Sequence, residues 1–167
     1  MMVTIVPLVE DQARSFMRWQ YSDPYAMYNI SSEDEEATVR FFLDPQNGYF
    51  AITDEEGTLV GFCNFGADGR VPGGDYSAEA IDIGMGMRPD LTGQGNGMHY
   101  AGTVFDFAKI HYPDQDHRVT IAEFNQRAQQ LCSNFGFARV GRFAREKDGR
   151  MFVVMIRELD GEIDRLS

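Results

Sequence analysis

Cysteine and long hydrophobic runs are scarce in this sequence, and each shortage excludes a class of protein. The two cysteines among 167 residues are too few for a disulfide framework or a zinc site. No apolar stretch approaches the roughly 20 residues that a membrane-spanning helix needs. No basic segment followed by a long apolar one indicates a secretory signal at the N-terminus. We therefore expect a cytoplasmic protein that does not contact membranes.

Positive charge is scarce as well. Only 15 Lys and Arg residues oppose 26 Asp and Glu residues, which gives a formal net charge of −11. A nucleic-acid partner is excluded because it would need a basic face on the protein. The acidic balance would steer a cationic amine toward the protein, although solubility alone explains the same charge. The three histidines, His99, His111 and His117, fit no metal-binding spacing, so we expect no metal.

Length and composition favour one domain over residues 1–167. Hydrophobic residues make up 43% of the chain, which is ordinary for a globular protein with a sizeable core. The polar tail at 160–167 is expected to fray. Patterning predicts strands at 3–8, 48–53, 58–65, 81–87, 119–124, 138–143 and 150–159. A first helix carries Ala13 to Gln20, and a second begins at a capping box of Ser32 and Glu35.

The stretch from Ser77 to Ile110 organises the rest of the chain. Apolar and polar residues alternate over 81–87, which predicts a strand with one buried face and Asp82 on the other. Glycines follow at 93, 95 and 97, and a helical apolar pattern begins directly after them. This order of strand, glycine loop and helix places free backbone N–H groups at the positive end of a helix dipole. Such a point binds phosphate.

The spacing of the glycines separates several kinds of phosphate loop. A Walker loop is excluded because no Gly-Lys-Ser/Thr follows, and a G-x-G-x-x-G dinucleotide loop would need a glycine at Met98. A glycine-rich turn without a ligand stays open as an alternative, as does a nucleotide-binding domain of another type.

The loop itself, Thr92-Gly93-Gln94-Gly95-Asn96-Gly97, resembles the Gln/Arg-x-x-Gly-x-Gly/Ala pyrophosphate loop of the GNAT superfamily of acyl-CoA-dependent N-acetyltransferases. Thr92 replaces the leading Gln or Arg of that pattern. In the same superfamily a strand ends in Asn and is followed by x-x-Ala-x-x-Leu-Tyr-x-x-x-Gly-Phe. The second pattern is matched by Asn125, Ala128, Leu131, Gly136 and Phe137, with Cys132 at the tyrosine position. Two motifs in the right order are far more specific than either one alone.

The resemblance implies an α/β (α+β) fold, a GNAT-like twisted mixed sheet with helices on both faces and splayed central parallel strands. It implies an N-acetyltransferase that moves an acetyl group from acetyl-CoA to a primary amine by direct transfer in a ternary complex. An acyl-CoA-binding sensor or regulatory module of the same fold without catalysis is the alternative. The acceptor is a small molecule or a peptide, and its identity stays open. Dimers are common in the superfamily, so a homodimer is compatible with the resemblance.

The resemblance also assigns residues. The pyrophosphate is expected on the main chain of the loop, and the pantetheine arm along the end of the preceding strand, where an N–H group stabilises the oxyanion. The residues expected to bind acetyl-CoA are Met85, Gly86, Met87, Thr92, Gly93, Gln94, Gly95, Asn96, Gly97 and Asn125.

Three residues are candidates for the chemistry. An amine with a pKa near ~10 is protonated at neutral pH, so a base or a chain of waters must remove its proton. Asp82 is the first candidate base, and Glu123, on the neighbouring strand, is the second. Cys132 stands where a tyrosine often protonates the leaving thiolate. It is either that acid or a small apolar residue of the helix, and no nearby histidine favours a covalent acetyl-cysteine.

Overall fold

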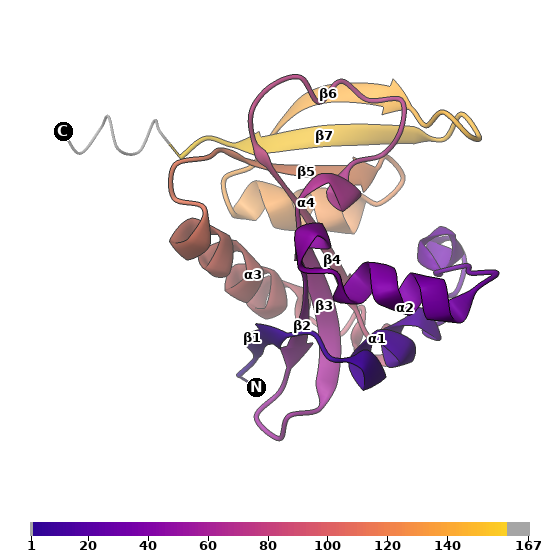
Figure 1. The fold of residues 1–167 in the computed structure, drawn as a ribbon. Helices are drawn as coiled ribbons and strands as arrows, with labels where there is room; N and C mark the ends of the chain where they lie inside the picture. The colour runs from indigo at the N-terminus through magenta and orange to yellow at the C-terminus, as the bar shows by residue number, and fades with distance from the viewer. Residues whose placement is uncertain (1, 160–167) are drawn as a thin grey trace. The chain divides into compact units, whose positions relative to one another are not determined.

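The computed structural model of the protein describes residues 2–159 (Figure 1). Contacts divide the chain into two compact units, the first comprising residues up to 64 with 85–104, and the second 65–84 with the residues from 105 on. The predicted α/β fold with a mixed sheet is confirmed: the seven strands follow the order β1-β2-β3-β4-β5-β7-β6. That the chain is one folding domain stays a prediction. The tail at 160–167 lies outside the described residues.

The strand bounds agree with the sequence pattern to within two residues at most ends. The strands are β1 (Thr4–Pro7), β2 (Tyr49–Thr53), β3 (Leu59–Phe65), β4 (Ile81–Met87), β5 (His117–Ala122), β6 (Ala138–Ala144) and β7 (Met151–Arg157). The α-helices are α1 (Glu10–Met17), α2 (Glu35–Leu43), α3 (Gly97–His111) and α4 (Gln126–Asn134). No helix in the described part of the chain is both long and apolar enough to span a membrane.

The first unit is built on the antiparallel strands β1, β2 and β3. Asp54 begins the predicted hairpin turn between β2 and β3, and Gly57 closes it with a φ of 81°, a left-handed conformation that suits glycine. Apolar residues of α1 and α2 pack together against the sheet. In this core the rings of Phe16 and Phe62 stack with centroids 4.3 Å apart.

The start of α2 differs from the prediction. The N-cap is Asp34, whose carboxylate accepts a hydrogen bond from the Ala37 N–H at 3.2 Å, while Ser32 bonds to the Thr38 hydroxyl. The predicted capping box of Ser32 and Glu35 is therefore wrong. Glu35 cannot return to cap the helix because its carboxylate is paired with Arg14 at 2.8 Å.

The second unit contains the parallel pair of β4 and β5 and the antiparallel order β5-β7-β6. The ladder of β4 and β5 consists of two residue pairs, Ile81 with His117 and Asp82 with Arg118. β5 pairs with β7 over six residues, and β7 with β6 beyond it. β5 ends at Ala122, so Glu123 lies one residue past the strand on which it was predicted. The strand stops there because the Asn125 N–H turns back to the Ala122 carbonyl.

Candidate functional site

The glycine loop has the local geometry of an anion-binding loop. Gly93 and Gly95 have φ values of 72° and 82°, and α3 begins at Gly97. A Cβ added to Gly95 would meet no atom within 4 Å, so the backbone conformation alone calls for glycine there. Within residues 2–159, the N–H groups of residues 93–96 have no protein acceptor. Free N–H groups beside a helix N-terminus are the groups that hold phosphate.

Side chains of the same loop hold its shape. The Thr92 hydroxyl donates to the Pro89 carbonyl at 2.7 Å, and the Gln94 amide donates to the Asp90 carbonyl at 2.7 Å. Both side chains are therefore bound back to the short 3₁₀ helix Pro89–Leu91 that leads into the loop. In this structure Thr92 and Gln94 shape the loop, and their contribution to acetyl-CoA binding stays a prediction.

A tyrosine from the first helical region fixes the end of β4. The Tyr21 hydroxyl donates to the Met87 carbonyl at 2.6 Å, and the N–H of the same peptide, from Arg88, donates to the Val60 carbonyl at 2.9 Å. Burial raises the pKa of Tyr21 to about 12, so the phenol keeps its proton and remains a donor. A contact across 66 residues leaves no local signal in the sequence.

Gly86 is required by packing within the first unit. A Cβ on Gly86 would collide with the Phe62 ring, and a Cβ on Gly61 would lie 2.8 Å from the Gly86 carbonyl oxygen. Gly86 was expected among the residues that bind acetyl-CoA, and the structure places the Phe62 ring next to it. Its neighbour Met85, also expected to bind acetyl-CoA, is 38% exposed.

The first candidate base, Asp82, is buried in an ion-pair cluster. Its Oδ1 accepts from the Arg118 Nε at 2.6 Å, and its Oδ2 accepts from the Arg118 Nη2 and the Arg70 Nε, both at 2.8 Å. The Asp82 side chain is 2% exposed and that of Arg118 is 1% exposed. The prediction that only one face of β4 is buried is therefore wrong at Asp82, because the two arginines cover its other face. Guanidinium groups therefore bind both oxygens of this carboxylate.

The second candidate base, Glu123, lies at the surface just after β5. Its carboxylate bonds to the guanidinium groups of Arg142 and Arg139, the latter at 3.3 Å. The hydrogen bond from Arg142 lowers the pKa of Glu123 below its usual value. A carboxylate with a lowered pKa is a weaker proton acceptor at neutral pH.

The second motif forms the start and end of α4. The Asn125 side chain accepts from the Ala128 N–H at 3.1 Å and so caps the N-terminus of α4, and Gly136 follows the helix with a φ of 91°. Cys132 is buried on α4, and burial raises the pKa of its thiol to about 12. This thiol keeps its proton, which disfavours a thiolate nucleophile and makes it a weak acid for the leaving group.

The predicted residues thus fall into two groups. The loop and Met85 to Met87 belong to the first unit, while Asp82, Glu123, Asn125 and Cys132 belong to the second. Their catalytic and binding roles stay predictions. In the part of the chain that the structure describes, no group of three His, Cys, Asp or Glu residues is placed to hold a metal ion.

Comparisons with known proteins agree with this architecture. The chain is similar in structure to a chimera of Vibrio cholerae spermidine N-acetyltransferase SpeG and hSSAT, with 16% identity, a TM-score of 0.72 and coverage of 99% of this chain and 100% of that one. It is also similar to a GNAT-family acetyltransferase from Bacillus anthracis, with 13% identity, a TM-score of 0.73 and coverage of 96% of each chain. Identities this low show the fold alone. No curated protein sequence matches significantly. The family model described as "Acetyltransferase (GNAT) family" matches residues 12–137, and the chain therefore belongs to the GNAT acetyltransferase family.

Proposed function

We propose that the protein transfers an acetyl group from acetyl-CoA to a primary amine within a ternary complex. The observation that carries the proposal is the loop of residues 93–96, whose free N–H groups adjoin the N-terminus of α3. Family membership supports acetyl transfer in general, and the loop supports a diphosphate-bearing co-substrate. The cytoplasmic location rests on the cysteine count and stays a prediction.

Direct transfer makes few chemical demands on the protein. The amine nitrogen attacks the thioester carbonyl, a C–N bond forms, the C–S bond breaks, and CoA leaves as a thiolate that takes up a proton. An N–H donor near the end of β4 stabilises the oxyanion, and one such donor is typically worth about 3 kcal/mol. Tyr21 fixes the peptide between Met87 and Arg88, whose own N–H donates to Val60, so the donor would be an N–H of Met85 to Met87.

The proton of the ammonium must leave before attack, and the two candidate bases would do this differently. Asp82 is buried and guanidinium donors bind both of its oxygens, so the amine would have to reach an enclosed carboxylate. Glu123 is more accessible, but its paired arginines stabilise its charged form. We keep Asp82 as the first candidate and Glu123 as the second.

Titration calorimetry with acetyl-CoA tests the loop. Gly95→Ala is expected to weaken binding by about tenfold or more, because an L-residue disfavours a φ of 82° and the loop that presents the free N–H groups would change its conformation. Gly57→Ala is the matched control, because Gly57 has a φ of 81° and equally open surroundings but lies in the β2–β3 hairpin. Equal affinity in both variants would refute the loop as the diphosphate site.

A thiol-release assay over a panel of amines tests the transfer itself. Spermidine heads the panel because several similar structures are described as spermidine N-acetyltransferases and because the net charge of −11 attracts cations. Small monoamines, amino acids and peptides with a free N-terminus complete it. Release of CoA that depends on an amine would support the proposal.

An acyl-CoA-binding module without catalysis is the second candidate function. The burial of Cys132, together with the arginines that occupy Asp82, favours this candidate. Acetyl-CoA binding without CoA release for any amine would decide for it. Cys132→Ala should leave the rate of an active enzyme within about tenfold, because a group with so high a pKa contributes little as an acid.

A further inference from the structure

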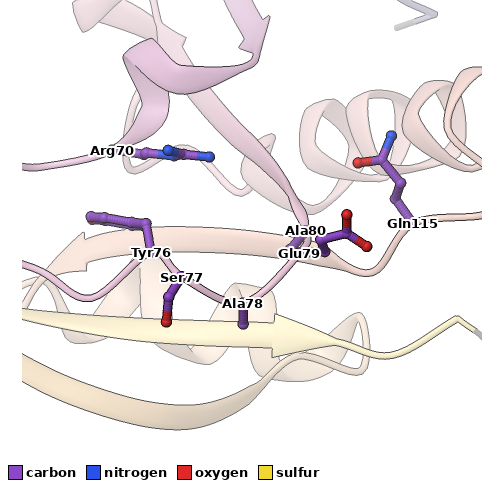
Figure 2. Close-up of a pocket in the computed structure, with 7 residues that line it drawn as sticks. All are labelled: Arg70, Tyr76, Ser77, Ala78, Glu79, Ala80 and Gln115. Carbon is purple, nitrogen blue, oxygen red and sulfur yellow. The ribbon is translucent and has the colours of Figure 1, made fainter.

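A pocket of about 350 Å³ lies in the second unit, and its lining includes no residue predicted to bind acetyl-CoA (Figure 2). Its wall is formed by the segment that leads into β4 together with two residues from other loops. The lining residues are Arg70, Tyr76, Ser77, Ala78, Glu79, Ala80 and Gln115.

One end of the pocket is a fixed arginine with unused donors. The Arg70 Nε binds the buried Asp82 at 2.8 Å, and the Arg70 guanidinium carbon lies 5.5 Å from the centre of the Tyr76 ring. Tyr76 is itself held, because its hydroxyl bonds to the Val71 N–H at 2.9 Å and to the Thr120 hydroxyl at 3.0 Å. Among residues 2–159, neither Nη group of Arg70 has a protein acceptor. A positioned guanidinium with free Nη groups matches a carboxylate.

Arg70 is the accessible cation of this wall. Two guanidiniums, from Arg70 and Arg118, bind the single carboxylate of Asp82 in direct ion pairs, and Asp75 also acts on Arg118 electrostatically. Arg118 is buried and Arg70 is 43% exposed, so Arg70 is the guanidinium that a ligand can reach.

The other end of the pocket is acidic and polar. Figure 2 shows Glu79 and Gln115 together, on the far side of the pocket from Arg70. Within the described chain the Glu79 carboxylate has no cationic partner. A carboxylate without a cation matches an ammonium group, and an amide side chain supplies both donors and acceptors for it.

We propose that this pocket binds a small zwitterion, with its carboxylate at Arg70 and its ammonium at Glu79 and Gln115. A ligand without net charge also avoids the repulsion that a free anion meets on a protein with a net charge of −11. Because the pocket is open and the ligand is small, a millimolar dissociation constant is expected. The site does not depend on the proposed acetyl transfer.

Amide NMR on the full chain, labelled with nitrogen-15, tests the site. Glycine, β-alanine and 4-aminobutyrate serve as zwitterions of increasing length, and acetate and propylamine as half-ligands. At least one zwitterion should shift the amide signals of Ser77 to Ala80 in a saturable way, with an affinity at least about tenfold above either half-ligand. The absence of saturable shifts with all three zwitterions, or equal affinity for acetate, would overturn the proposal.

Two variants locate the ligand at the two ends. Glu79→Gln and Arg70→Gln should each lower the affinity about tenfold, and the dispersion of the amide spectrum reports whether each variant is folded. Glu79→Gln leaves the Asp82 cluster intact, so it keeps the test valid if Arg70→Gln loosens the unit. Glu158→Gln and Arg40→Gln, which change exposed residues outside the pocket, are the matched controls. Unchanged affinity in Glu79→Gln would exclude the proposed orientation.

Discussion

Two clusters in the second unit have the same composition, one carboxylate and two arginines, but they differ in burial. Asp82 and Arg118 are almost fully enclosed, whereas Glu123 is 30% exposed and its partners Arg139 and Arg142 are about half exposed. Water screens the exposed cluster, so its ion pairs contribute little to stability. In the enclosed cluster, removal of one partner leaves an uncompensated charge. The same side chains therefore serve structure in one place and surface electrostatics in the other.

Asp82→Asn should have the largest effect. It leaves the guanidinium of Arg118 buried without a counter-charge, and breaking a buried pair in this way costs about 3–5 kcal/mol of unfolding free energy. Urea denaturation at neutral pH measures the loss. Glu123→Gln is the matched control and should leave the midpoint close to that of the parent protein. Equal losses in both variants would show that burial does not distinguish the clusters.

His117 extends the comparison to a buried group that is kept neutral. Its Nδ1 lies 2.8 Å from the Arg157 Nη2, which can only donate, and burial together with this cation lowers the pKa of His117 to about 4. The unfolded chain takes up this proton near pH ~6.5, so stability is lost as the pH falls from there toward 4. The slope should approach about 1.4 kcal/mol per pH unit.

Unfolding curves between neutral pH and about pH 5 measure that slope. His117→Asn should flatten the dependence, while the exposed His99→Asn should leave it unchanged. A parent protein whose stability is constant over this range would contradict the assignment of a neutral, buried imidazole.

The carboxylates of the two clusters also differ as candidates for the general base. If an active amine is found, Glu123→Gln should keep kcat/KM within about tenfold, because Asp82 is the first candidate base. Steady-state rates with saturating acetyl-CoA measure this, and Glu146→Gln is an exposed carboxylate control. A loss of a hundredfold or more, which is typical for removal of a general base, would move that role to Glu123.

The effect of salt on the stability of the variants should be the smallest of these effects. Any difference in stability between the parent protein and Glu123→Gln should disappear in about 1 M sodium chloride, where the Debye length is about 3 Å. The loss in Asp82→Asn should persist under the same conditions, because Asp82 and its partner Arg118 are shielded from solvent. A loss in Asp82→Asn that salt removes would mean that water reaches the buried cluster.

Local patterns in the sequence predicted most of the fold. Strand alternation predicted β4 over 81–87 with its observed bounds, and the motif residues Asn125 and Gly136 lie directly before and shortly after α4. These features depend on neighbours within a few residues. The Ser32 capping box was wrong because Arg14, 21 residues away, binds the glutamate that it needed.

The surroundings of the candidate site were much harder to predict. Asp82 was identified as a carboxylate of interest, but its two arginines are 12 and 36 residues away. One signal was available: Arg118 directly precedes the predicted strand at 119–124, and a charge that enters a buried strand requires a counter-charge on a neighbour. The hydrogen bond of Tyr21 to Met87 had no comparable signal.

The pairing of Asp82 with Arg118 also determines how β4 and β5 align. The two residues are direct neighbours in a parallel ladder of only two residue pairs, which is too short for backbone hydrogen bonds to select one alignment. If one strand shifted by one residue, its charged side chain would point to the opposite face of the sheet. Both charges would then be buried without a counter-charge. The ion pair therefore favours the observed alignment of β4 and β5, because a shifted alignment costs the free energy of two buried charges without partners.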